Sequence, residues 1–385
     1  MLHMDLPRPF WFLWVGTLIN RFGYFVIPFL TLYLVRHQGF DPATAGAVVS
    51  AFGAGSLVSQ PLGGWLTDRV GRRPTLVAGM LATAAAYLAL GAAASPLVLT
   101  ACAVAAGLAT DLYRPAVAAI VADLVAPEQQ RRAFGLLYWA INLGVGVASV
   151  LGGMLAERNF GLLFVIDAIT CVGFAAIVLI AVPETKPARS AAATATALDP
   201  RLVGLTASTF VVAVVYFQGF VTLPLAMQAH GLDAAAYGLV AAVNPVVILV
   251  CQPILMRLLA KHSLVYVYAI SGVLSGIGFG LTLAAESTAG FAATVVVWTL
   301  GEIALNISAP AILAAIAPAD MRGRYQGVWG TSWGLAMLVA PVAGTATWQR
   351  FGAGPLWLGC LVAASAATCS LLVWRAKWTV MPSPA

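Results

Sequence analysis

Four ionisable side chains lie deep inside long apolar stretches of this sequence: Arg21, Asp111, Arg114 and Glu302. A charge in such surroundings costs several kcal/mol unless it is paired or wetted, so residues of this kind often bind ions, protons or substrates. Asp111 and Arg114 are three residues apart, which places them on one face of a helix and allows them to pair. The chemistry that these residues indicate is the movement of charge, or of protons, through an apolar environment.

Glu302 differs from the other three because no charged residue shares its helical face, on which Asn306 is the polar neighbour. Loss of hydration favours the protonated form of a carboxyl group, so such a residue can load and release protons near neutral pH. We predict that Glu302 is the main proton carrier and that Asp111, Arg114 and Arg21 assist it. The alternative is that these three form a structural ion-pair cluster that never titrates and that Glu302 is structural as well.

Polar and aromatic residues at helical spacing indicate which faces line a cavity. Three pairs lie four residues apart, and three single residues complete the predicted lining: Asn20 with Tyr24, Tyr138 with Asn142, Trp329 with Trp333, and Tyr216, Asn244 and Asn306. A mixed aromatic and amide lining favours a bulky, partly apolar ligand, which ring faces and carboxylates can also select for positive charge. Alternatively, each of these aromatic residues lies at the lipid interface or in helix packing.

The elements that position these residues are membrane-spanning helices. Hydrophobic residues make up 61% of the chain and charged residues 9%, far from the roughly half and quarter of a soluble domain. Apolar stretches long enough to cross about 30 Å of hydrocarbon recur along the whole chain. We predict twelve spans, at residues 9–35, 43–66, 74–94, 97–122, 132–155, 161–182, 203–228, 235–259, 264–285, 290–315, 325–348 and 355–375. Asp167, Glu157 and Glu286 then fall near or in outer loops, where we expect them to be solvated.

The basic residues set the orientation. Apart from Arg21 and Arg114 inside spans, every Lys and Arg falls on one side of this map except Arg36, Arg158 and Arg350. By the positive-inside rule we expect both termini and the central loop in the cytoplasm, and a multi-pass protein of a bacterial inner membrane. Because the basic residues are scattered over loops rather than gathered in one patch, nucleic acid is not an expected partner.

The two halves of the sequence are related. Residues 126–131 (AlaProGluGlnGlnArg) align with 317–322 (AlaProAlaAspMetArg), and residues 39–41 (GlyPheAsp) align with 231–233 (GlyLeuAsp). Two such halves predict a duplicated carrier with its substrate near the middle of the membrane. We expect an all-α integral membrane fold with two pseudo-symmetric six-helix bundles, at residues 1–182 and 203–385. Residues 183–202 are expected to form a flexible cytoplasmic linker.

A motif between the second and third spans reads Gly64-Trp65-Leu66-Thr67-Asp68-Arg69-Val70-Gly71-Arg72-Arg73. It resembles the signature loop of the major facilitator superfamily, with Thr67 in place of the usual alanine. Gly64 is expected to allow a close helix approach, Gly71 a tight turn, and Asp68 a carboxylate at a positive helix N-terminus. The resemblance implies a cytoplasmic conformational latch made of Gly64, Asp68, Arg69, Gly71, Arg72 and Arg73. In that latch Asp123 would pair with Arg69 or Arg72, and the loop would meet a helix that begins near Arg324.

Within that superfamily the chain resembles the twelve-span drug:proton antiporters. The stretch Tyr138-Trp139-Ala140-Ile141-Asn142-Leu143 and the pair Gly301-Glu302 carry this likeness, and Arg114 resembles the arginine of the family's second motif. The sequence departs from the family pattern in two places. Pro115, Val117 and Ala118 break the second motif around Arg114. Residues 148–153 keep the Gly-Gly of the efflux motif but lack its Gly-Pro. The resemblance implies proton-driven export of amphipathic or drug-like molecules by alternating access. The alternative is a proton-coupled uptake symporter for a nutrient such as a sugar or peptide, because Arg21-Phe22 resembles part of a peptide-carrier motif.

An enzyme is not expected. The sequence has no HExxH, no paired aspartates and no Ser/His or Ser/Lys set of an intramembrane enzyme, and its five cysteines lack CxxC spacing. We therefore expect no metal site and no cofactor, with the proton gradient as the energy source. The expected partners are a small-molecule substrate, protons and the lipid bilayer, and the expected state is a monomer.

Overall fold

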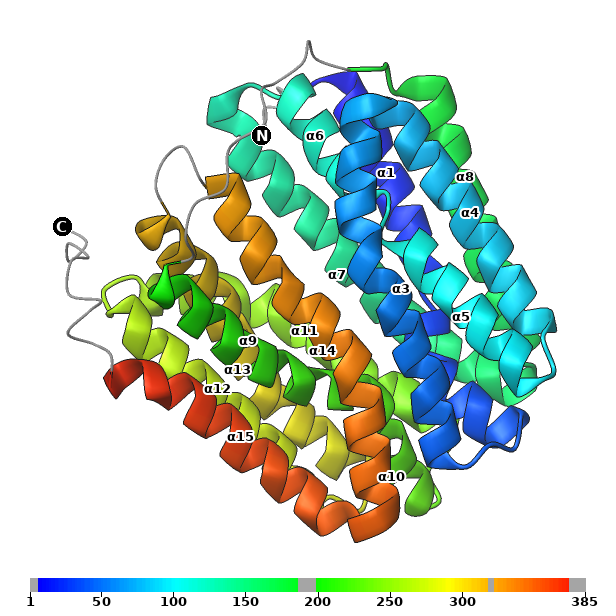
Figure 1. The fold of residues 1–385 in the computed structure, drawn as a ribbon, viewed down its shortest axis with the longest axis vertical. Coiled ribbons are helices and arrows are strands. Elements are labelled where there is room, and N and C mark those ends of the chain that lie inside the picture. The colour runs from blue at the N-terminus through cyan, green and yellow to red at the C-terminus, as the bar shows by residue number, and fades with distance from the viewer. Residues whose placement is uncertain (1–5, 186–198, 318–321, 374–385) are drawn as a thin grey trace. The chain divides into compact units, whose positions relative to one another are not determined.

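The computed structural model describes residues 6–185, 199–317 and 322–373 of the chain (Figure 1). Over these residues the structure is helical, with no strand. The chain divides into two compact units, Met1–Phe40 with Ala47–Ala193, and Asp41–Gly46 with Thr194–Ala385.

The first unit contains α1 to α8, except for residues 42–46 at the start of α3, which belong to the second unit. Their bounds are α1 Arg8–Phe22, α2 Val26–Leu32 followed by a π-helical turn Tyr33–His37, α3 Pro42–Arg69, α4 Arg72–Ala92, α5 Pro96–Thr110, α6 Arg114–Leu124, α7 Pro127–Arg158 and α8 Gly161–Ala181. Its core joins α1, α4, α6, α7 and α8 through side chains such as Phe10, Leu76, Met80 and Phe174, all of them buried.

The second unit contains α9 to α15. Their bounds are α9 Pro200–Val221, α10 Leu223–Ala229, α11 Ala234–Leu259, α12 Leu264–Gly280 followed by a 3-10 turn Leu281–Ala284, α13 Thr288–Ile316, α14 Arg322–Phe351 and α15 Ala353–Val373. Its core gathers Leu205, Val212, Tyr268 and Ile312 from α9, α12 and α13, with partly buried Trp329 packed against them.

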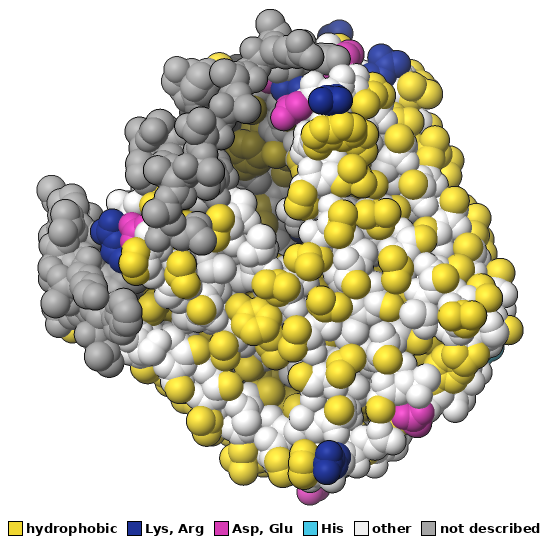
Figure 2. All heavy atoms as spheres, in the orientation of Figure 1, with side chains coloured by type: hydrophobic (Ala, Val, Ile, Leu, Met, Phe, Trp, Pro, Cys, Tyr) yellow, Lys and Arg dark blue, Asp and Glu magenta, His cyan; other side chains and the backbone are white. Residues whose placement is uncertain are grey.

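These helices follow the predicted spans to within a few residues. Eleven segments in the described part of the chain are long and apolar enough to cross a membrane, from Arg8–His37 to Ala353–Leu372. The predicted span 325–348 coincides with α14, which has 30 residues but falls short of the apolarity of the other eleven. On the face shown in Figure 2, hydrophobic side chains cover the flanks of the helices and charged side chains lie near the helix ends.

Three of the spans that the sequence predicts as continuous are broken. The helix stops at Gly23–Phe25 in span one, at Asp111–Tyr113 in span four and at Thr222 in span seven. A proline follows each break within the first turn of the next helix, at Pro28, Pro115 and Pro224. A proline ring clashes with the carbonyl four residues earlier, but the first turn of a helix tolerates it, so a new helix starts there.

The internal repeat is visible in the turn chemistry of the two halves. Gly39 and Gly231 both have a positive φ, +74° and +75°. Two residues later, Asp41 accepts hydrogen bonds from the backbone N–H groups of Ala43 and Thr44, and Asp233 accepts one from Ala236. Hydrogen bonds from Thr44, first from its hydroxyl and then from its backbone, hold the pKa of Asp41 below its usual value. The aligned tripeptides thus form the same left-handed glycine and aspartate cap before α3 and α11.

Replacing Gly231 with Ala is expected to destabilise the protein by about 1 kcal/mol, because an L-residue is strained in the left-handed region. A β-carbon there would meet no atom within 4 Å, so the cost is conformational rather than steric. Thermal unfolding of the detergent-solubilised protein measures it. The control is Gly359→Ala, at an exposed helical glycine that also has open space around it, which should leave the midpoint unchanged or slightly raised. Equal midpoints for the two variants would contradict the assignment.

Candidate functional site

Glu302 lies near the middle of α13 and is partly buried. Its Oε2 accepts a hydrogen bond of 2.6 Å from Nδ2 of Asn244 on α11, and the same amide donates to the hydroxyl of Thr299 at 3.0 Å. Among the described residues Glu302 forms no ion pair. The carboxyl group is therefore held by a neutral amide and has no fixed counter-charge.

Two glycines bring α12 and α13 into backbone contact beside this carboxyl. A β-carbon at Gly301 would lie 2.4 Å from the Ser275 hydroxyl, and one at Gly278 would lie 2.4 Å from the backbone nitrogen of Trp298. Such distances exclude any side chain, so each helix needs glycine where it touches the other. The Gly301-Glu302 pair thus combines a close approach to α12 with a carboxyl group facing α11.

Aromatic side chains surround the other side of Glu302. A small cavity of about 10 Å³ is lined by Glu302 together with Val212, Tyr216, Ser275, Phe279, Trp298, Leu305 and Trp333. The ring of Tyr216 packs edge-on against Trp298 and Trp333, with centroids 5.8 and 5.6 Å apart. The structure thus brings together four residues that the sequence indicated separately, Tyr216, Asn244, Glu302 and Trp333.

Trp298 belongs to this cluster although the sequence prediction omitted it. Its side chain is buried, and its Nε1 has no hydrogen-bond partner. The sequence contains a signal for this position, because Trp298 precedes Glu302 by four residues and therefore shares its helical face. An unpartnered indole N–H beside a small cavity is a donor that a ligand could use.

Trp329 and Asn306 lie elsewhere in the second unit. The Trp329 indole donates to the Thr209 hydroxyl at 3.1 Å, within the core between α9 and α14. Asn306 is exposed. Neither lines the small cavity beside Glu302.

In the first unit Asp111 and Arg114 pair as predicted, with Nε of Arg114 2.7 Å from Oδ1 of Asp111. They do so across the turn between α5 and α6 rather than along a continuous helix. Arg21 on α1 is only 6% exposed and donates to the Tyr113 hydroxyl. Its guanidinium lies over the rings of Tyr24 and Tyr113, 5.1 and 5.9 Å from their centroids.

Arg21 has no carboxylate within ion-pair distance in the described part of the chain, and its Nε lacks a hydrogen-bond partner. Of the three residues expected to form a charge cluster, Asp111 and Arg114 form an ion pair, and Arg21 packs against Tyr24 and Tyr113 beside them. A β-carbon at Gly144 of α7 would lie 2.4 Å from that of Arg21, which shows how tightly this arginine is enclosed.

The amides predicted to line a cavity in this unit are largely buried. Asn20 donates to the Cys171 sulfur at 3.3 Å, and Asn142 donates to the backbone carbonyl of Tyr138 at 2.9 Å. Each is 7% exposed. Tyr24 and Tyr138 are half-buried.

The expectation that Asp167 is solvated is wrong. Its side chain on α8 is 3% exposed, and its Oδ2 accepts the backbone N–H groups of Phe25 and Val26 at 3.3 and 3.2 Å. These N–H groups are left without helical partners by the break between α1 and α2. In the sequence, Pro28 is the signal for that break, and a new helix start needs a group such as a carboxylate to accept its first N–H groups. Glu157, in contrast, forms a partly exposed ion pair with Arg36 at 2.7 Å.

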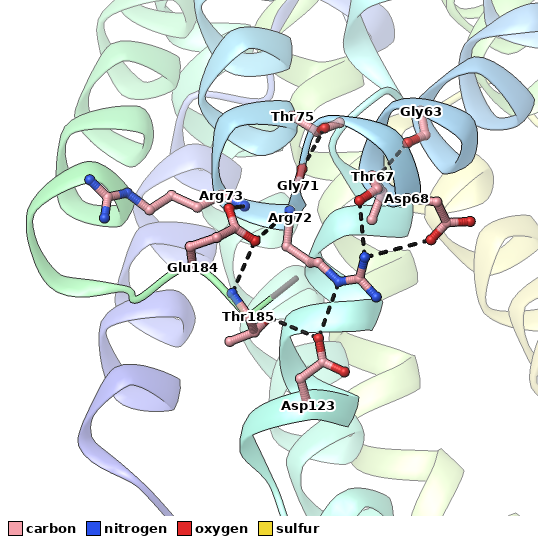
Figure 3. A network of polar contacts seen from close by, with 10 residues as sticks. All are labelled: Gly63, Thr67, Asp68, Gly71, Arg72, Arg73, Thr75, Asp123, Glu184 and Thr185. Atoms are coloured by element: carbon pink, nitrogen blue, oxygen red, sulfur yellow. Dashed lines mark hydrogen bonds and ion pairs between the residues drawn. The ribbon is translucent and has the colours of Figure 1, made fainter. Parts of the chain in front are cut away.

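The signature loop is organised around Arg72 at the start of α4 (Figure 3). Arg72 is 6% exposed; its Nε lies 3.1 Å from Oδ2 of Asp123, and its Nη1 donates to the backbone carbonyl of Thr67 at 3.0 Å. Of the two predicted partners of Asp123, the structure thus shows Arg72. Gly71 has φ +130°, the conformation that its predicted turn requires.

Two other parts of this loop differ from the prediction. A β-carbon at Gly64 would meet no atom within 4 Å, whereas one at Gly63 would lie 2.4 Å from the Leu112 carbonyl oxygen, so the close approach is at Gly63. Asp68 is 81% exposed in its side chain and lies 3.6 Å from Arg72. The side chain of Arg324, the expected start of a contacting helix, is outside the described residues. Arg69 stacks on the exposed ring of Trp65, 5.0 Å from its centroid.

Glu184 is a member of this site that the sequence analysis placed in the flexible linker. Its carboxylate accepts the backbone N–H groups of Arg72 and Arg73 at 2.9 and 3.0 Å, at the positive end of α4 (Figure 3). Thr185 then donates to Asp123 at 2.8 Å. The first two described residues after Pro183 are therefore fixed to the loop.

Within the residues that the structure describes, no group of three His, Cys, Asp or Glu side chains could hold a metal ion. The site chemistry consists of the carboxyl group of Glu302, the Asp111–Arg114 pair, the buried Arg21 and the loop around Arg72. Its reactive groups can exchange protons or pair with charged ligands.

The sequence is similar to that of known membrane transporters. The sequence profile of the Major Facilitator Superfamily matches residues 13–227 and 204–384. The uncharacterized MFS-type transporter YttB of Bacillus subtilis is 27% identical over 372 residues, covering 93% of this chain and 92% of that protein. Multidrug resistance protein MdtH of Aeromonas salmonicida is 27% identical, covering 94% of each.

Solved structures share the fold. A POT family transporter crystallised with 5-aminolevulinic acid has a TM-score of 0.83 at 17% identity, covering 98% of each chain. The human organic anion transporter MFSD10 has a TM-score of 0.69 at 16% identity, covering 94% of this chain and 98% of that one. At these identities the likeness concerns the fold alone.

Arg72→Ala is expected to destabilise the protein by about 2–3 kcal/mol, because it leaves Asp123 and the Thr67 carbonyl without their buried partner. Thermal unfolding in detergent measures the loss. Arg73→Ala is the matched control, since Glu184 binds the backbone of Arg73 and not its side chain. If the Arg73 variant were as unstable as the Arg72 variant, the Arg72 contacts would not be the source of stability.

Asp167→Ala is expected to cost about 1–3 kcal/mol, because it leaves the backbone N–H of Val26 unpaired, whereas the N–H of Phe25 keeps the Gly23 carbonyl as an acceptor. Asp167→Asn keeps an acceptor oxygen and should lose clearly less. Chemical unfolding of the two variants in the same detergent distinguishes them. Equal losses would show that Asp167 does not cap α2.

Proposed function

Because this chain belongs to the Major Facilitator Superfamily of membrane transporters, we propose that it is a proton-coupled exporter of small amphipathic or drug-like molecules. The observation that carries this proposal is the environment of Glu302. Its carboxyl group lies in a membrane-spanning helix beside Tyr216, Trp298 and Trp333, with an amide as its hydrogen-bond donor and no ion-pair partner in the described chain.

A carboxylate without a fixed cation can be neutralised by a proton or by a cationic ligand. The aromatic rings next to it favour a ligand with apolar surface and positive charge. Proton and substrate would then compete for Glu302, and this competition is the basis of antiport. Alternating access would expose the site in turn to the two sides of the membrane.

We assign supporting roles to the first unit. The Asp111–Arg114 pair, with Arg21 beside it, would respond to the charge change at each step, and residues 64–73 with Asp123 would form the cytoplasmic latch. Asn20, Tyr24, Tyr138, Asn142, Asn306 and Trp329 would contribute to the substrate path. The protein would act as a monomer in a bacterial inner membrane, with both termini in the cytoplasm.

Export of drug-like compounds is supported by the relative named multidrug resistance protein MdtH, which is similar over nearly the whole chain. The alternative is proton-coupled uptake of a nutrient. Arg21 favours it, because a buried guanidinium without a carboxylate partner in the described chain could bind an anionic group of a substrate.

Glu302→Gln is expected to abolish transport driven by a pH gradient, because the amide cannot bind and release a proton in place of the carboxyl group. The measurement is movement of ethidium, a lipophilic cation, in proteoliposomes under an imposed pH gradient. Glu286→Gln is the matched control, since Glu286 is exposed in the described structure.

Unimpaired gradient-driven transport by Glu302→Gln would exclude Glu302 as the proton site. Sugars and peptides are assayed in the same vesicles. Accumulation of one of these with the gradient, and no movement of ethidium, would replace export by uptake.

A further inference from the structure

A second cavity lies on the second unit, away from Glu302. It is a groove of about 320 Å³ between α9 and α15, lined by Pro200, Arg201, Gly204, Ala207, Ser208, Val211, Ala367, Ser370 and Leu371. Small side chains form most of its wall. In Figure 1 α9 and α15 are the green and red helices of this unit.

The length of the groove matches one leaflet of a bilayer. Its residues on α9 run from Pro200 to Val211, and eleven steps of about 1.5 Å give a length of about 16 Å. The hydrocarbon core of a bilayer is about 30 Å thick, so each leaflet supplies about half of that. Pro200 is the first residue of the candidate span Pro200–Ala229, so the groove starts at one end of this span.

This end of the groove carries a fixed guanidinium. Arg201 forms an ion pair with Asp199, with Nη2 2.8 Å from Oδ2, and its side chain is 34% exposed. Burial opposes ionisation of Asp199, but the hydrogen bonds from Arg201 outweigh it and hold the pKa of Asp199 below its usual value. The pair therefore persists at neutral pH. It uses the Nε and Nη2 groups, so the fork of five N–H donors keeps others that can reach a phosphate.

Hydrogen bonds join the two helices that line the groove. Ser208 on α9 donates to the backbone carbonyl of Ala367 on α15 at 2.7 Å, and the Tyr268 hydroxyl donates to Ser208 at 3.1 Å. The Thr209 hydroxyl extends this hydrogen-bond network. It lies 3.1 Å from the Tyr268 hydroxyl and accepts a hydrogen bond of 3.1 Å from the Trp329 indole. A wall fixed in this way forms a site that exists before its ligand arrives.

We propose that this groove is a binding site for one phospholipid, with the phosphate on Arg201 and an acyl chain along Gly204, Ala207 and Val211. An apolar channel one leaflet long, with an arginine at one end, fits the two parts of such a molecule. The proposal does not rest on the transport mechanism, because the groove and the cavity beside Glu302 share no lining residue.

The test is native mass spectrometry of the detergent-solubilised protein titrated with phosphatidylglycerol. We expect one tightly held lipid in the wild type. Arg201→Ala should weaken its binding about tenfold, by loss of charge-assisted hydrogen bonds. Gly204→Leu should abolish it by filling the groove, since a β-carbon at Gly204 already lies 3.7 Å from Leu371.

Two controls keep the result specific. Gly359→Leu adds the same side chain at an exposed glycine of α15 outside the groove, and Arg257→Ala removes an exposed arginine at the end of α11. Both should bind lipid like the wild type. Undiminished binding by Arg201→Ala and Gly204→Leu would overturn the site, whether or not the protein proves to be an exporter.

A photoreactive side chain introduced at Ala207 identifies the occupant in native membranes. A cross-linked lipid mass is the expected product. A cross-link to residues 374–385 of the chain, or to another protein, would overturn the proposal. Binding of phosphate-free diacylglycerol as tightly as phosphatidylglycerol would also overturn it, since Arg201 would then contribute nothing.

Discussion

The requirement that every backbone polar group inside hydrocarbon find a partner within the protein governs this structure. Where the helices are continuous their own hydrogen bonds meet it. Where prolines break them, other residues must act, and Asp167 does so for the N–H groups of Phe25 and Val26. Charged side chains inside the spans also have partners. The Arg21 guanidinium stacks on two tyrosine rings, and Asp111 forms an ion pair with Arg114. Glu302 stands out because its partner is a neutral amide.

The two units treat buried charge differently. The first contains the buried Arg21 and Asp167, linked to neighbouring helices by hydrogen bonds and ring contacts, and the partly buried Asp111, which pairs with the exposed Arg114. In the described second unit Glu302 is the ionisable group in the middle of a span, and aromatic rings form its surroundings. A duplicated fold has thus diverged in chemistry while keeping the glycine and aspartate turns before α3 and α11.

The sequence predicted the features that depend on the length of an apolar run or on the spacing of residues close together in the chain. Apolar runs located the spans, and the three-residue spacing of Asp111 and Arg114 predicted their pair. It did not reveal what depends on contacts between distant segments. Glu184 lies 112 positions from Arg72, and Asp167 lies 141 from Val26, so no local pattern links them. Gly63 and Gly64 are adjacent on one helix, and only the position of Leu112 shows which of them faces a neighbour.

The glycine contacts between α12 and α13 bear on how the site could accept ligands of different size. At Gly278 and Gly301 the two helices are in backbone contact, so Trp298 and Glu302 lie on a helix that packs directly on α12. Tyr216 of α9 packs edge-on against Trp298, and Trp333 of α14 packs edge-on against Tyr216. Breadth of specificity in such a pocket would therefore come from rotation of these two rings, while the position of the charge stays constant.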